Sequence, residues 1–234
     1  MHKTASMHGF MLAIIANKCP YVNTLKCFMY SVKSLTLQGK HIPEQLRSIA
    51  DAPKTLFYRG KSLDDLLKRP VIAIVGSRKV DQYGIYATKL LSGDLARNGA
   101  LIVSGLALGV DAIAHTSALE NGGESLAVLA CGIDNIYPRS NIQLGRRLLE
   151  HGGIVSEHNA DYSPRQYDFL IRNRLISGLS QAVIVTQAAA RSGSLNTARL
   201  ALEQGRAVMA VPGPITNPLC EGPNNLLKMG AVPV

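Results

Sequence analysis

Four short segments of the sequence carry side chains that can bind a phosphate or stack on a base. The first is Gly76-Ser77-Arg78-Lys79, which follows an apolar run beginning at Val71. The guanidinium of Arg78 can donate two hydrogen bonds to a phosphate or lie flat against a ring. It can equally pair with a structural carboxylate such as Asp134 or Glu157. This loop alone therefore indicates either anion binding or an internal ion pair.

The same loop lacks the residues that a nucleotide cofactor requires. A dinucleotide site reads G-x-G-x-x-G and has an acidic residue about 20 positions later. Here Arg78 and Asp81 take the second and third glycine positions, and the second predicted strand leads into Ser104. No G-x-x-x-x-G-K-[ST] sequence occurs either. We therefore expect no NAD, no Walker-type nucleotide and no other cofactor.

The second segment, SGLALGVD, begins at Ser104. Gly105 and Gly109 open its backbone, and exposed amides at a helix start favour anions. Asp111 can cap the helix that follows. Asp111 and His115 are four residues apart on one helix face, a spacing that suits an acid–base pair or metal ligands. We favour a capping aspartate and a packed histidine, and we expect no metal site.

The third segment, PRQYDFLIRNRLISGLS, begins at Pro164 and places cations around one aromatic residue. Single-stranded nucleic acid requires this combination, because cations neutralise its backbone and an aromatic face stacks on any base. The alternative is that the aromatic belongs to the core and the arginines are solvated. The candidate residues of this segment are Phe169, Arg172, Asn173 and Arg174, with Arg165 nearby.

The fourth segment, RSGSLNTARLALEQG, places Ser192, Gly193 and Ser194 before a predicted helix. Small hydroxyl residues at a helix start can cap the helix, and the same donors can hold a phosphate. Capping is the default function here, and anion binding would be added to it.

The elements that must position these loops alternate regularly after Pro70. Apolar strand, polar loop and amphipathic helix recur at lengths suited to right-handed crossover units, and the apolar runs do not alternate, as in strands covered on both faces. This pattern predicts an α/β, Rossmann-like three-layer domain with a mainly parallel sheet over residues 70–234. The predicted strands are Val71–Val75, Ala100–Val103, Ser125–Ala130, Ala182–Thr186 and Ala207–Val211, and the predicted helices are Tyr83–Asn98, Asp111–Glu120, Ile142–His151, Tyr167–Leu179 and Ser194–Gln204.

The residues before this domain divide into two parts. Residues 34–69 predict a small lead-in subdomain with a short strand, a helix beginning at Pro43 and an extended run from Pro53 to Tyr58. Residues 1–33 show no sustained periodicity, and we expect them to be disordered or to belong to an upstream start, with Met29 as an alternative initiator. Phe10–Ala16 is apolar but too short to span a membrane, so we expect no membrane association.

Charge and cysteine content narrow the function classes. The chain of 234 residues has a formal net charge of +9, but residues 1–69 hold 11 Lys and Arg against 4 Asp and Glu, whereas residues 70–234 hold 14 against 12. Binding of phosphates by the main domain therefore depends on where its arginines lie. The four cysteines form no C-x-x-C pair, which excludes a disulfide framework and indicates a reducing, cytosolic compartment.

Taken together, the motifs resemble the DprA/Smf family of bacterial DNA-processing proteins. The resemblance runs from about Ser34 to Val234 and leaves residues 1–33 outside. Many members also carry a helical domain before the lead-in and a winged-helix domain after this stretch, and the motifs cover neither. The matching motifs, in order, are GSRKVDQYG, SGLALGVDAIAH, AVLACGIDNIYP, SEH, RNRLISGLS, RSGSLNTARLALEQGR, AVPGPI and GPNNLLKMGA.

The resemblance implies a homodimeric, non-enzymatic protein that binds single-stranded DNA, shields it and loads the RecA recombinase. The family's DNA-contacting arginine corresponds to Arg78, and its base-stacking aromatic corresponds to Phe169. Two departures bear on affinity: Leu108 stands where many members have arginine, and Gln187 stands where many have glutamate, which we expect to offset part of the lost charge. The DNA-binding residues implied are Gly76, Ser77, Arg78, Lys79, Ser104, Gly105, Phe169, Arg172, Asn173, Arg174, Ser192, Gly193 and Ser194.

The alternative from another class is a nucleotide or phosphoribosyl hydrolase of the lysine-decarboxylase-like type on a similar fold. Those proteins carry a P-G-G-x-G-T loop, and the nearest stretch here, Val211-Pro212-Gly213-Pro214-Ile215, lacks it. A regulatory domain that senses a small nucleotide is a third possibility, since loops that bind one phosphate chain can bind another.

Overall fold

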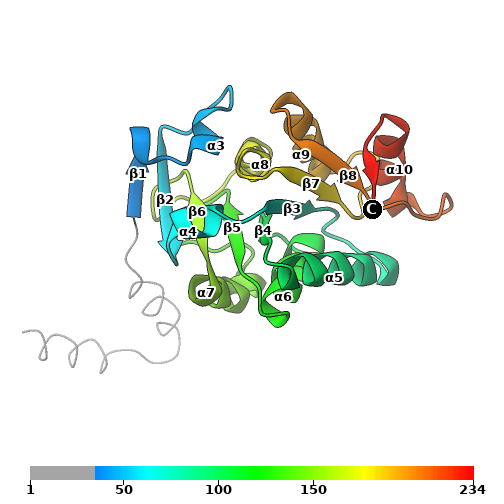
Figure 1. Ribbon diagram of the computed structural model, residues 1–234, viewed down its shortest axis with the longest axis horizontal. Coiled ribbons are helices and arrows are strands. Elements are labelled where there is room, and N and C mark those ends of the chain that lie inside the picture. Colours follow the sequence, from blue (N-terminus) through cyan, green and yellow to red (C-terminus); the bar gives the residue numbers. More distant parts are fainter. Residues whose placement is uncertain (1–34) are drawn as a thin grey trace, which may run out of the picture.

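One continuous sheet organises residues 35–234, which are the residues that the computed structural model describes (Figure 1). The expectations for residues 1–33 lie outside this range. The strand order is β1-β2-β6-β5-β4-β3-β7-β8-β9. β2 pairs antiparallel with both β1 and β6, and all other pairs are parallel. The strands are β1 (Leu35–Gln38), β2 (Thr55–Gly60), β3 (Val71–Val75), β4 (Leu101–Ser104), β5 (Ser125–Leu129), β6 (Gly152–Ser156), β7 (Ala182–Val185), β8 (Ala207–Ala210) and β9 (Val232–Pro233).

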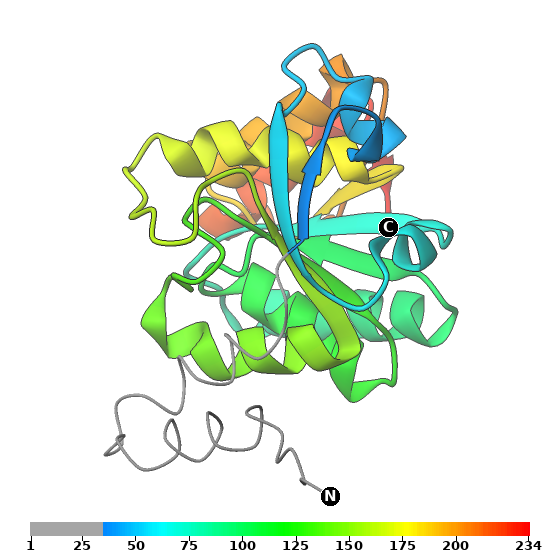
Figure 2. The same ribbon diagram turned by 90° about the vertical axis from the view of Figure 1, so that its left-hand side faces the viewer.

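Helices cover both faces of the sheet, which confirms the predicted three-layer α/β fold. Figure 2, with β1 and β2 in front, shows one group of helices above the sheet and another below it. In Figure 1, α5, α6 and α7 lie on one face, and α3, α8 and α9 lie on the other. The helices are α3 (Glu44–Arg47), α4 (Leu63–Leu67), α5 (Gln82–Arg97), α6 (Val110–Glu120), α7 (Ile142–His151), α8 (Asp168–Leu179), α9 (Gly193–Glu203) and α10 (Glu221–Lys228).

The five predicted strands and five predicted helices after Pro70 are confirmed to within one residue at each end. Strand β6 is absent from the prediction because it begins with two glycines, which local propensity disfavours in strands. Tertiary packing explains them. A side chain at Gly153 would place its Cβ 2.5 Å from the hydroxyl of Tyr58 on the paired strand β2. The glycine therefore leaves room for a fully buried tyrosine.

The parallel strands are buried on both faces, which is why their sequences do not alternate. Ile74 packs with the apolar side chains of α5 and α6. Its neighbour Val75 points to the other face and packs with α8, including Leu175 and Ile176. Successive residues of β3 thus enter two different cores, and the strand end that carries the Gly76 loop is held from both sides.

The lead-in segment extends the same sheet rather than standing beside it. β1 and β2 add two antiparallel strands next to β6. Pro43 precedes α3, as predicted, and Leu46 on α3 lies against Gly178 of α8. The division at residue 69 stays a prediction. Within residues 35–234, no helix combines the length and the apolar character that a membrane-spanning segment needs.

Candidate nucleic-acid interface

The candidate site lies where the order of the parallel strands changes direction. From β3, the sheet grows through β4, β5 and β6 on one side and through β7 and β8 on the other. Connections that leave neighbouring strands in opposite directions open a crevice at the strands' carboxyl ends. Gly76–Lys79 follows β3, and the Ser192–Ser194 turn follows β7 and begins α9. The fold therefore brings these two predicted segments to one place.

A pocket of about 200 Å³ occupies this crevice. All four predicted segments contribute to its wall. Ser77 and Lys79 flank it without lining it, and Ser104 and Gly105 lie behind it, buried. Eight predicted residues line it directly: Gly76, Arg78, Phe169, Arg172, Asn173, Ser192, Gly193 and Ser194.

The Gly76–Lys79 loop is a fixed turn. The amide of Ser77 donates to the carbonyl of Gln187 at 2.6 Å, and the amide of Lys79 donates to the hydroxyl of Ser77 at 3.1 Å. A Cβ at Gly76 would lie 2.6 Å from that same carbonyl and from a methyl of Val110. Glycine is therefore required for the close approach of β3 to its neighbours, and the turn presents the exposed Arg78 side chain outward.

The guanidinium of Arg78 lies over the ring of Phe169, with 5.1 Å from Cζ to the ring centroid. This is cation–π geometry. The alternative ion pairs do not form, since Asp134 pairs with Arg59 and Glu157 pairs with Arg174 at 2.7 Å. The cation at the crevice therefore keeps its hydrogen-bond donors available for a ligand.

Arg172 lies beneath Arg78 as a buried support. It donates to the carbonyls of Gly105, at 2.9 Å, and Val128. Burial lowers its pKa, and the nearby Asp111 opposes that effect. Burial likewise raises the pKa of Asp111, which Arg172 lowers in turn. The charge of each group thus offsets part of the effect of burial on the pKa of the other, and both groups line the pocket.

The prediction that Asp111 caps the following helix is wrong. Helix α6 begins at Val110, and Gly109 is its N-cap residue, with no side-chain cap. The Asp111 carboxylate instead accepts hydrogen bonds from two amides of the preceding loop, those of Gly105 at 3.1 Å and Ala107 at 3.4 Å. Asp111 lies inside the first turn of α6 and faces back toward β4. Its carboxylate therefore binds the loop that precedes the helix.

The prediction that His115 is a packed residue is confirmed. The ring is fully buried, and Nδ1 lies 2.7 Å from the hydroxyl of Ser125. That hydroxyl donates to the carbonyl of Ile102, so Nδ1 carries the ring proton and donates to it. Burial, followed by the charge of Arg172, lowers the pKa of His115 to about 3. No cluster of three or more His, Cys, Asp or Glu within residues 35–234 could hold a metal ion.

The two other residues of the R-N-R motif have different positions. Asn173 donates to the carbonyl of Gly193 at 3.2 Å and so ties α8 to the Ser192–Ser194 turn. Arg174 lies outside the pocket, where it pairs with Asp51 at 2.8 Å as well as with Glu157. The structure therefore brings Asn173 to the site but not Arg174, and a direct contact between Arg174 and DNA stays a prediction.

The start of α9 carries the predicted cap. Ser192 is the N-cap residue, and its hydroxyl accepts from the amide of Ser194 at 3.3 Å. The two hydroxyls also lie 2.8 Å apart. Because this helix start lines the pocket, its positive dipole end adds to the attraction for an anion.

The two positions that depart from the family pattern differ in exposure and in contacts. Leu108 is 47% exposed. Gln187 is fully buried, and its side chain bonds to the amide and the carboxylate of Asp81. Gln187 does not line the pocket. Its replacement of a glutamate therefore cannot offset the missing arginine at Leu108 through a direct contact with a ligand in the pocket.

A second, wider hollow adjoins the pocket across Arg78 and Phe169 and extends beyond the four predicted segments. Its volume is about 790 Å³. Tyr137 and Arg139 enter it from the loop after β5, the same sheet edge that bears the other four segments. The sequence does carry a signal for this hollow: an aromatic residue and an arginine lie two positions apart in the loop after the predicted strand Ser125–Ala130. We refer to the pocket and this hollow together as the groove.

The fold defines a Rossmann-like α/β protein, and its groove at the sheet's switch point is lined by arginine and aromatic side chains. The chain belongs to the family of DNA recombination-mediator protein A, whose model matches residues 33–234. It is 49% identical over 191 residues to Protein Smf of Escherichia coli, covering 81% of this chain and 50% of that protein. The chain thus spans half the length of this relative.

Two solved structures share the fold closely. The structure of DNA processing protein A from Helicobacter pylori, studied for its single-stranded DNA binding mode, is 37% identical with a TM-score of 0.78, and the match covers 86% of this chain and 91% of that one. DNA processing protein A from Streptococcus pneumoniae is 37% identical with a TM-score of 0.81, and the match covers 99% and 80%.

Proposed function

We propose that this chain binds single-stranded DNA without sequence preference along the groove, and that it thereby acts as a recombination mediator that shields the strand and loads RecA recombinase. Family membership supports the mediator role. The DNA-binding mode named for the Helicobacter pylori protein supports the ligand. The activity is one of binding, without catalysis.

The observation that carries this proposal is the contact between Arg78 and Phe169. The guanidinium of Arg78, stacked on the partly buried ring of Phe169, can donate two hydrogen bonds to a phosphate beside an aromatic face that can stack on a base. Asp134 and Glu157 are paired with other arginines, and Arg78 forms no ion pair with any of residues 35–234. A ligand with a negative charge and planar bases suits this contact, because stacking on an aromatic face tolerates any base.

Structural contacts hold the three candidate catalytic groups of the hydrolase alternative, Asp111, His115 and Glu157. Asp111 lines the pocket, but its carboxylate accepts hydrogen bonds from the amides of Gly105 and Ala107. His115 is fully buried with a pKa of about 3, and its Nδ1 donates a hydrogen bond to the hydroxyl of Ser125. Glu157 is held by both oxygens against Arg174. Neither His115 nor Glu157 lines the pocket. Incubation with nucleoside monophosphates discriminates directly, since release of free base would revive the hydrolase.

The test is a titration with single-stranded and double-stranded oligonucleotides of equal length. Oligo(dT) should bind tightly and the duplex weakly, because a paired base cannot present its face to Phe169. Binding should weaken steeply as salt rises, since phosphate contacts release counterions. Equal affinity for both ligands, or affinity independent of salt, would contradict the proposal. Mononucleotides that compete at low concentration would instead favour the small-nucleotide sensor.

The proposed partners are a second copy of this chain, through the Rossmann-like domain, and RecA, in the cytoplasm. Exposed apolar side chains at the β9 end of the sheet support self-association, including Ile215 at 96% and Met229 at 72% exposure. Sedimentation velocity tests the dimer, and Met229→Glu should shift it toward monomer. Assembly of RecA on strands precoated with single-strand binding protein, with and without this chain, tests loading.

A further inference from the structure

The wider part of the groove contains an aromatic platform that Phe169 does not account for. The ring of Tyr137 lies 5.8 Å from that of Phe169, centroid to centroid, and the two planes are inclined by 55°. Rings this close and this inclined leave no room for a base between them. Tyr137 is nonetheless 50% exposed. Its free face therefore points into the hollow rather than against the protein.

The surroundings of Tyr137 suit a nucleotide. Arg139 is exposed and forms no ion pair with any of residues 35–234. Asn135, Ser163 and Gln166 add amide and hydroxyl groups to the same walls, and no carboxylate lines the hollow. A cation, neutral polar groups and one aromatic face are what a single-stranded nucleic-acid site combines.

We infer that Tyr137 and Arg139 form a second nucleotide subsite, in which the next base along the strand stacks on the free face of Tyr137 and Arg139 binds its phosphate. This inference rests on the proposed function and extends it to a defined path. The strand runs from the Ser192–Ser194 turn, across Arg78 and Phe169, to Tyr137. Arg78 and Phe169 line both hollows, so two successive nucleotides share the contact between them.

Substitutions at Tyr137 separate stacking from other roles. Tyr137→Phe keeps the ring and should bind oligo(dT) within about twofold of the unmodified chain. Tyr137→Leu keeps apolar volume without a π-face and should weaken binding by about 5- to 150-fold, the range for loss of one base–aromatic contact. Tyr86→Leu is the matched control, because Tyr86 is 66% exposed on α5 and lines no part of the groove.

A double variant distinguishes a stacking role of Tyr137 from a role that only supports Phe169. If Tyr137 only holds Phe169 in place, the double variant Tyr137→Leu/Phe169→Leu should bind no more weakly than Phe169→Leu alone. Two stacking sites should instead make the double variant clearly weaker than either single variant. Ultraviolet cross-linking of the strand should also attach thymine to Tyr137 as well as to Phe169.

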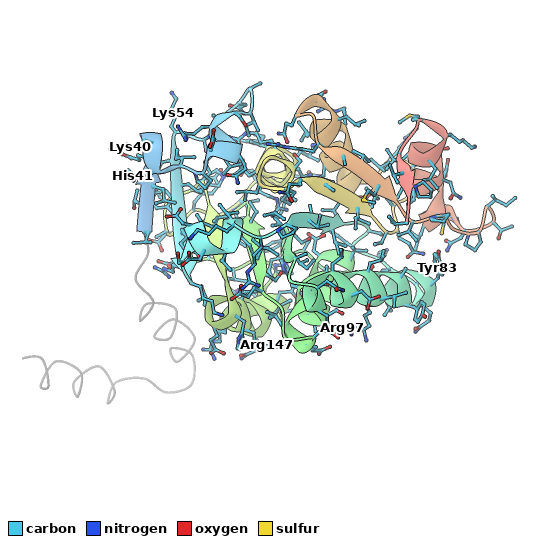
Figure 3. All side chains as sticks on the ribbon, in the orientation of Figure 1. Lys40, His41, Lys54, Tyr83, Arg97 and Arg147 are labelled. Atoms are coloured by element: carbon cyan, nitrogen blue, oxygen red, sulfur yellow. The ribbon has the colours of Figure 1, made fainter. Side chains whose placement is uncertain are left out.

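Arg139→Ala should lower the slope of log affinity against log salt by about 0.7, the value for one phosphate contact on a single strand. Arg147→Ala is the control, since Arg147 lies on α7, on the face of the sheet opposite α8 (Figure 3). Cross-links to Phe169 without Tyr137, an unweakened Tyr137→Leu variant, or an unchanged salt slope for Arg139→Ala would overturn the second subsite and leave the proposed function standing. Failure of the unmodified chain to bind oligo(dT) would refute both.

Discussion

Replacing Arg78 with alanine removes the one cationic side chain among residues 35–234 that lines both hollows of the groove, next to Phe169. The change deletes a guanidinium 5.1 Å from the ring centroid and leaves the turn beneath it intact, because that turn is held through Ser77. Arg78 is exposed. Surface substitutions of this kind alter the free energy of unfolding by about 0.5 kcal/mol or less, so any loss of binding reports on the groove.

The expected loss of binding free energy is about 1–3 kcal/mol, from a phosphate fork and its stacking contact. This corresponds to a rise in Kd of about 5- to 150-fold. The salt slope should fall by about 0.7, since one phosphate contact disappears. Arg78→Lys should keep that slope while losing part of the affinity, because an ammonium keeps the charge but not the planar fork.

Fluorescence anisotropy with labelled oligo(dT) at several salt concentrations measures both quantities. Arg97→Ala is the control: Arg97 is exposed at the far end of α5 from Tyr83 (Figure 3), lines no part of the groove, and contacts Asp94 on α5 and Asn121 at the end of α6. An Arg78→Ala variant that binds within twofold of the unmodified chain, with the same salt slope, would refute the assignment of this loop to phosphate binding.

Three further predictions address the groove and its support. Leu108→Arg should tighten oligo(dT) binding and steepen the salt slope by about 0.7, since Leu108 is exposed beside the Arg78 turn; unchanged affinity would place position 108 outside the strand's path. Gly76→Ala should lower the free energy of unfolding by about 1–3 kcal/mol through overpacking, visible as a melting temperature lower by about 2–4 °C per kcal/mol; an unshifted melting curve would contradict the close approach. His115 has a folded pKa of about 3, below its ordinary value, so the unfolded chain binds the extra proton and stability falls as pH drops from about 6.5 toward 3. His115→Gln should remove this part of the pH dependence, which amounts to at most about 1.4 kcal/mol of unfolding free energy per pH unit. Denaturant titrations of both proteins across this pH range measure it, and the same pH dependence of unfolding free energy in the variant would contradict the prediction.

The sequence predicted the parallel core well because its signal is local. Apolar runs such as Val71–Val75 reflect burial on both faces, and a capping residue and a glycine mark the two ends of helices such as α5 and α9. β6 escaped prediction because Gly153 is selected by Tyr58, a residue 95 positions earlier in the chain that meets it only in the folded sheet. No window of neighbouring residues contains that information.

The candidate site divides in the same way. Residue types and loop positions predicted that Arg78, Phe169 and the Ser192–Ser194 turn would meet, since parallel strands bring their loops to one edge. They could not separate Arg78, which faces the crevice, from Arg172 and Arg174. Helical geometry turns Arg172 beneath the pocket and Arg174 toward Asp51, and only the packing of α8 decides which cation remains free for a ligand.

The continuity of the sheet has a practical consequence for anyone who expresses part of this chain. A fragment that begins at residue 70, where the strand–helix repeat starts, would lack β2 and leave β6 as an edge with its backbone donors and acceptors unpaired. It would also uncover the apolar face that Leu46, Leu56 and Tyr58 occupy. Long apolar edges of this kind pair with other chains and aggregate. A soluble fragment should therefore begin before Leu35, so that β1 shields the edge with its own short, polar-flanked strand.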